Sequence, residues 1–208
     1  MPITLAAPPE SVMTELAATL PRIAGSAAVE ERAPSITRAA GRFSLGGQMR
    51  VARAPADIAD ADALPIPVYV LGLDQLAEGR LEDGARLALW SHIVSTEAGP
   101  VSAEVTSEGS QFAQVSNARA VGRARSSLIR MAEGEGEGAD APDGEAAELR
   151  IPALHTSLLW IRGRRPTLEV LDTQLAELRV GRRYSAEELA AILQPIAQQR
   201  LRDPEGEG

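Results

Sequence analysis

The sequence predicts an α+β fold: a mainly antiparallel sheet built from hairpins, with a middle amphipathic helix and a C-terminal helix, preceded by a helical N-terminal arm. Three observations support this fold class. Val101, Ala103 and Val105 alternate with polar residues, as in a strand with one buried face. The apolar period then changes to that of a helix, and Ser185 with Glu188 forms a capping box before a last helical stretch. Strands joined by hairpins and interrupted by single helices favour an antiparallel α+β domain over βαβ units.

Residues 1–63 are weakly patterned and are interpreted as an N-terminal arm with one helix. That helix is expected over residues 9–23, where Val12, Leu16 and Leu20 recur at four-residue spacing. Residues 25–35 are small and polar and are interpreted as a linker. Because this arm has little pattern of its own, we expect it to be separable from the rest of the chain, as a docking arm is.

Residues 64–201 are expected to form the α+β domain. Its helix over residues 116–132 has an apolar stripe formed by Val121, Ala124, Leu128 and Met131. The other expected elements are strands at 68–71, 86–94, 101–106, 111–115, 149–161 and 167–171, a short helix at 73–78, and the C-terminal helix after Ser185.

An acidic block separates the middle helix from the next strand. Residues 133–148 contain seven acidic residues and no basic one, so we expect a flexible acidic loop there. Residues 149–161 are apolar on both faces, which predicts one central strand, with Pro152 at its entry or at a bulge. Residues 202–208 are interpreted as a polar tail.

Composition excludes several chemistries. The chain has 208 residues, 29 acidic and 21 basic, and a formal net charge of −8; every basic residue is arginine, and there is no cysteine. Lysine Schiff bases, phosphate loops that need lysine, thiol nucleophiles and thiolate metal sites are therefore excluded. We expect no cofactor. Because the N-terminus lacks signal-peptide features and no apolar run reaches 18 residues, we expect a cytoplasmic protein without membrane contact.

The two histidines suggest one enzymatic alternative. His92 and His155 both fall in predicted strands, and together with Glu104 or Glu97 they could bind a metal ion that activates water. This alternative is a small metal-dependent hydrolase using His92, His155 and Glu104. Against it, neither histidine has a known ligand spacing such as H-E-x-x-H, and a lone strand histidine is commonly a core or edge residue.

The leading hypothesis is a non-enzymatic protein-interaction or structural module that binds a protein partner or itself. Its motivation is mainly the absence of catalytic motifs, together with the separable N-terminal arm and the segregation of charge, because two arginine clusters flank the acidic block. If these clusters converged, guanidinium groups could receive a phosphate or an acidic partner. Net charge −8 and few aromatic residues argue against nucleic acid. The predicted partner-binding residues are Arg119, Arg123, Arg130, Arg162, Arg164, Arg165, Arg182, Arg183, Trp90 and Trp160.

Overall fold

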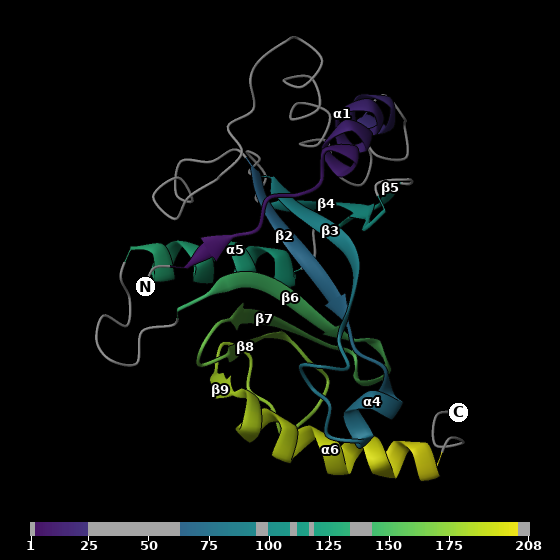
Figure 1. Ribbon diagram of the computed structural model, residues 1–208, viewed down its shortest axis with the longest axis vertical. Helices are drawn as coiled ribbons and strands as arrows, with labels where there is room; N and C mark the ends of the chain where they lie inside the picture. Colours follow the sequence, from purple (N-terminus) through teal and green to yellow (C-terminus); the bar gives the residue numbers. More distant parts are fainter. Residues whose placement is uncertain are drawn as a thin grey trace.

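A curved sheet with helices on both faces organises the chain (Figure 1). The computed structural model describes residues 3–24, 63–94, 100–108, 112–116, 119–133 and 143–203. Within these ranges, nine strands form one sheet. The strands are β1 (Thr4–Leu5), β2 (Ala63–Val70), β3 (Arg86–Val94), β4 (Val101–Thr106), β5 (Phe112–Ser116), β6 (Glu145–Ile151), β7 (Thr156–Arg162), β8 (Thr167–Asp172) and β9 (Arg183–Ser185). The helices are α1 (Glu10–Ala24), α4 (Leu73–Ala77), α5 (Arg119–Ala132) and α6 (Ala186–Arg202), with a 3-10 turn η2 (Pro152–Leu154).

The sheet is mostly antiparallel, as predicted. Its order is β5-β4-β3-β2-β6-β7-β8-β9, and the strands that follow one another along the chain from β2 to β5 and from β6 to β9 pair antiparallel. β6 has two parallel neighbours along one edge: β1 pairs with its first residues, and β2 pairs with its last ones. The sequence did not predict these two pairings, because they join segments far apart in the chain, whereas a hairpin joins neighbours.

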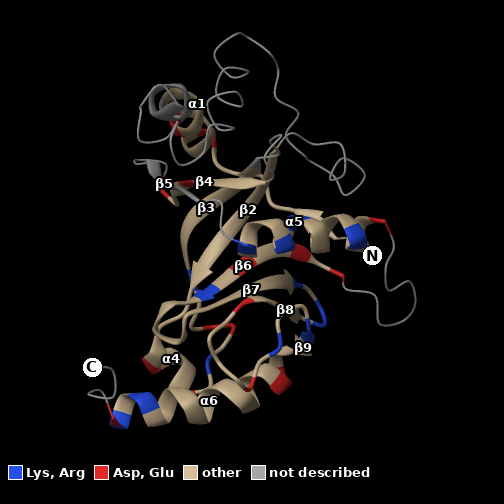
Figure 2. Cartoon of the chain, turned by 180° about the vertical axis from the view of Figure 1, so that it is seen from behind, with Lys and Arg blue, Asp and Glu red and all other residues tan. Residues whose placement is uncertain are grey.

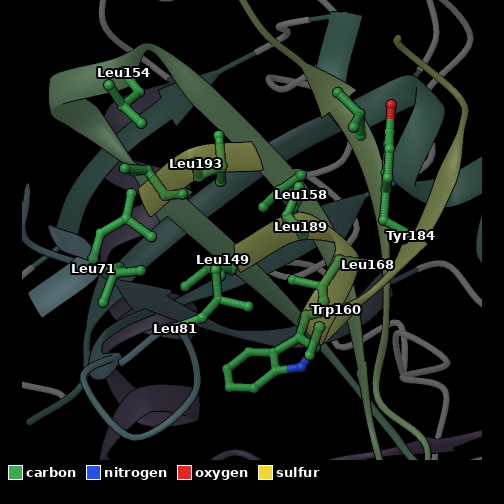
Figure 3. Close-up of a cluster of buried hydrophobic side chains, with 14 of the residues drawn as sticks. Leu71, Leu81, Leu149, Leu154, Leu158, Trp160, Leu168, Tyr184, Leu189 and Leu193 are labelled. Carbon is green, nitrogen blue, oxygen red and sulfur yellow. The ribbon is translucent and has the colours of Figure 1, made fainter. Parts of the chain in front are cut away.

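Alternation along the strands builds two hydrophobic clusters, one on each face of the sheet. On one face Leu158 and Trp160 of β7 pack with residues of α4 and α6, including Leu193 (Figure 3). On the other face Leu159 and Ile161 pack with the apolar stripe of α5. A strand covered on both faces is apolar at successive positions, which explains the continuous apolar run predicted for this region.

The prediction of one strand over residues 149–161 is wrong, because the run contains a tight turn. Pro152 begins η2, where its missing N–H is tolerated, and His155 closes the turn in the left-handed conformation at φ 45°. β6 also begins at Glu145, inside the predicted acidic loop of residues 133–148. Ala146 and Ala147 are fully buried there, so the last residues of the acidic block belong to the sheet and pack in its core.

The first residues of the predicted N-terminal arm are part of the fold. β1 pairs with β6, and Ile3, Val12 and Leu16 are buried. The linker expected at 25–35 and the central part of the acidic block, residues 134–142, lie outside the described residues, as does most of the polar tail. Helix α6 begins with the predicted capping box: the Glu188 N–H donates to the Ser185 hydroxyl at 3.1 Å, and the Ser185 N–H donates to the Glu188 carboxylate at 2.9 Å. None of the helices in the described ranges has the length and apolar character needed to cross a membrane.

Candidate anion-binding site

Helix α5 presents arginines beside the stripe that it buries. Ala124, Leu128 and Met131 face the sheet. Arg123 and Arg130 are seven residues apart, which is close to two helical turns, so they lie on the same side of the helix. Figure 2 shows basic positions along α5 and further basic positions in the chain around β8 and β9.

A pocket of about 560 Å³ lies against this side of α5. Among the described residues that line it, four are arginines and one, Glu169, is a carboxylate. The pocket is therefore locally positive although the chain carries a net charge of −8. Its lining residues are Pro100, Arg119, Gly122, Arg123, Arg125, Ser126, Ser127, Arg130, Glu169 and Gly181.

Glu169 fixes two of the guanidinium groups. Glu169 is only 4% exposed. Successive side chains of β8 point to opposite faces of the sheet, so Glu169 faces α5 while Leu168 faces α6. One carboxylate oxygen accepts hydrogen bonds from the Ser127 hydroxyl and from Arg130 Nη2, the latter at 3.4 Å. The other oxygen accepts from Arg183 Nε at 3.1 Å. A buried carboxylate needs such partners, so the burial of Glu169 also determines where these arginines lie.

Arg123 is held by the end of β8. Its Nε donates to the carbonyl oxygen of Leu171 at 2.5 Å, and its Nη2 contacts Asp172 Oδ1 at 3.4 Å. Long side chains lose much rotamer freedom when they bind a ligand, and anchoring them in advance reduces that loss. Arg123, Arg130 and Arg183 are thus preorganised by contacts within the chain.

A second charged cluster consists of Arg150 and the two carboxylates that pair with it, Glu104 and Glu148. Arg150 Nη2 donates to Glu104 Oε1 at 2.7 Å and its Nε donates to Glu148 Oε1 at 2.6 Å. The Ser102 hydroxyl donates to Glu104 Oε1 at 3.5 Å and lies 2.7 Å from the Ser91 hydroxyl, so both serines join the cluster. Burial acts to lower the pKa of Arg150, but hydrogen bonds to Glu148 and Glu104 outweigh it, and the pKa is raised above its usual value. We interpret this cluster as a structural link between β4 and β6.

The structure does not assemble the metal site proposed from His92, His155 and Glu104. His92 is opposite Ala103 in the β3–β4 ladder, whereas Glu104 is opposite Ser91, so the two side chains point to opposite faces of the sheet. Glu104 pairs with Arg150, and His155 is exposed in the η2 turn. No group of three or more potential ligands that could hold a metal ion occurs in the described part of the chain. His92, His155 and Glu104 are therefore not brought together in the described structure, and Glu97 lies outside the described residues.

His92 is instead a buried residue of the β3 strand. It is fully buried, and burial lowers its pKa to about 4. Among the described residues, neither ring nitrogen has a hydrogen-bond partner. A neutral imidazole in the core is the state that this environment favours.

Both tryptophans predicted to bind a partner lie in the core. Trp90 is 5% exposed and Trp160 is 2% exposed, so neither ring offers a binding surface. Trp160 lies among leucines of the α6 face (Figure 3). Trp160 belongs to β7, which is covered on both faces and therefore buries its large side chains, whereas Trp90 is buried in β3.

The predicted arginines divide between several places. Arg119, Arg123 and Arg130 line the pocket, and Arg183 reaches its Glu169. Arg162 lies elsewhere, with its guanidinium 4.4 Å from the Tyr69 ring centre and 4.9 Å from that of Trp160. The remaining predicted arginines are not among the lining residues: Arg182, next to Gly181, lies over the Tyr184 ring, and Arg164 and Arg165 are exposed in the turn between β7 and β8.

The sequence prediction missed Glu169 and Ser127, and it left Arg125 out of the predicted binding residues. The available signal was a single acidic residue, Glu169, between the apolar residues Leu168 and Val170 of a predicted strand.

Comparison of the chain with protein-family models, with curated proteins and with solved structures found no match.

Proposed function

We propose that the chain is a non-enzymatic binding module that docks an acidic segment of a protein partner in the pocket on α5. The observation that carries this proposal is the charge of the pocket lining, whose described residues include four arginines and one glutamate. Guanidinium groups form bidentate, charge-assisted hydrogen bonds with carboxylates and phosphates, so this lining suits an acidic group. Arginine is also enriched among the residues that dominate binding energies at protein interfaces.

The fixed positions of the arginines support binding rather than general solvation. Arg123 is anchored on Leu171 and Asp172, and Arg130 on Glu169. A solvated surface arginine has no such restraint. Nucleic acid is a poorer ligand for this pocket, because the lining residues that the structure describes include no aromatic side chain on which a base could stack, and the net charge of −8 opposes a polyanion.

The test is the binding of a labelled octapeptide of alternating glutamate and glycine, compared with the same peptide containing glutamine. Fluorescence anisotropy at low ionic strength should show binding of the acidic peptide only, with an affinity that falls as salt is added. Arg119→Gln should weaken it about threefold to tenfold, since Arg119 lines the pocket and is exposed. Arg202→Gln, an exposed arginine of α6, is the matched control and should bind like the native chain.

Equal binding of the acidic and neutral peptides, or equal losses in the two variants, would contradict the proposal. The partner can also be a second copy of this chain. Light scattering at several protein concentrations tests that case, because self-docking in the pocket predicts a dimer that Arg119→Gln weakens and Arg202→Gln does not.

A further inference from the structure

We infer that the group recognised in the α5 pocket is a phosphate monoester carried on an aliphatic side chain or a sugar. This inference rests on the proposed function and specifies the chemistry of the acidic ligand. A carboxylate brings one negative charge and two acceptor oxygens, whereas a phosphate monoester brings a charge of about −1.5 to −2 at neutral pH and three terminal oxygens. The described lining residues carry four positive charges and one negative charge, which matches the more highly charged group better.

The position of the donors along α5 suits a group with several oxygens. Arg119, Arg123 and Arg130 lie on one side of the helix over three turns, and the last two are about 10 Å apart along its axis. Side chains that converge from such a spacing can approach a tetrahedral group from both ends. Ser126 is exposed between them and lines the pocket, so its hydroxyl adds a neutral donor.

Glu169 positions the Arg130 and Arg183 side chains. It does not compete with a ligand for the other guanidinium groups of the pocket. It is buried, and its two oxygens already accept from Ser127, Arg130 and Arg183. Its charge is therefore compensated on the floor of the pocket, while Arg119 is exposed and Arg123 is anchored on the end of β8. Arg119 and Arg123 are therefore the donors that an incoming phosphate group would contact.

The size of the pocket and its uncharged lining residues indicate which kind of phosphorylated molecule would fit. The volume of about 560 Å³ is within the range of pockets that bind small molecules or single side-chain groups. Apart from the charged residues, the described part of the lining consists of Pro100, Gly122, Gly181 and two serines. These described residues include no aromatic ring or large apolar side chain on which a nucleobase could stack, so a phosphorylated serine or threonine, or a sugar phosphate, fits them better than a nucleotide.

Isothermal titration calorimetry of the full chain, in a buffer free of phosphate, can test the inference. The titrants are a phosphoserine peptide, the same peptide with glutamate in place of phosphoserine, and glucose 6-phosphate. We expect the phosphoserine peptide to bind at least tenfold more tightly than the glutamate peptide. Arg123→Gln should reduce that affinity at least fivefold, Arg119→Gln should reduce it without affecting folding because Arg119 is exposed, and Arg202→Gln should leave it unchanged.

Each outcome separates the two proposals. Equal affinity for the phosphoserine and glutamate peptides overturns the phosphate inference and leaves the acidic-segment function standing. Binding of glucose 6-phosphate as tightly as the phosphoserine peptide supports phosphate recognition but overturns the protein-partner function. Binding of none of the three titrants overturns both. A loss in Arg202→Gln as large as that in Arg119→Gln would also overturn the inference, since the charge effect would then not be local to the pocket.

Discussion

Acidification should destabilise this protein through His92. The folded chain binds a proton at His92 only near pH 4, whereas the unfolded chain binds it near the ordinary pKa of 6.5. Between these values the unfolded chain holds more protons, so stability is present above pH 6.5 and is lost as the pH falls toward 4. At pH 5 the linkage relation gives a loss of about 2 kcal/mol relative to neutral pH.

The assay is urea unfolding followed by tryptophan fluorescence at pH 7 and at pH 5. Trp90 and Trp160 are both buried, so unfolding exposes both rings and changes the signal. Carboxylates also lose contacts on acidification, so the quantity that isolates His92 is the difference in pH dependence between the native chain and His92→Leu. That difference should be about 2 kcal/mol. His155→Asn is the matched control, because His155 is exposed and asparagine tolerates its left-handed backbone conformation.

Equal pH dependence in the native chain and His92→Leu would refute this reasoning. If His92→Leu does not fold, an NMR titration of the two imidazoles in the native chain replaces it. A His92 ring that titrates above pH 6 in the folded state would refute the argument directly.

Three further predictions concern an ion pair, a helix cap and two glycines. Arg150→Met should cost about 2–4 kcal/mol of unfolding free energy, because it removes the guanidinium group that pairs with the buried Glu104 carboxylate; adding Glu104→Gln should recover part of the loss, as chemical denaturation of the single and double variants will show. Ser185→Ala should cost about 1 kcal/mol and lower the thermal midpoint, because the capping box of α6 is lost. Gly144→Ala should abolish stable folding, since its φ is 151° and a Cβ there would overlap the Arg162 carbonyl, whereas Gly122→Ala within α5 should raise the melting temperature.

Each of these predictions has an outcome that would contradict it. Additive losses for Arg150→Met and Glu104→Gln would show that the two groups are not coupled. A Ser185→Ala variant as stable as the native chain would mean that the cap contributes nothing. A well-folded Gly144→Ala variant would show that the close approach of Gly144 to the Arg162 carbonyl is not required.

Periodicity allowed much of the fold to be predicted. The α+β class, the antiparallel hairpins and the C-terminal helix all depend on contacts between neighbours in the chain, and these leave a local pattern. The boundary between β6 and β7 has no such pattern, because the residues around the turn from Pro152 to His155 include the apolar Ile151, Ala153 and Leu154, so the apolar run continues from the end of β6 into β7. Glu145, at the end of an acidic block, joins the sheet only because β1 and β7 pair with it.

The candidate site was predictable in part, for the same reason. That positive charge is concentrated in arginines around Arg119–Arg130 and around residues 162–183 was determined by the sequence alone. Which arginines meet was decided by the tertiary structure: one buried carboxylate, Glu169, draws Arg130 and Arg183 together, while Arg162 packs on aromatic rings beside Trp160. The physical reason is burial. A charge hidden from water must have partners, and which residues a fold hides depends on strand pairings and helix packing that no single stretch of the chain contains.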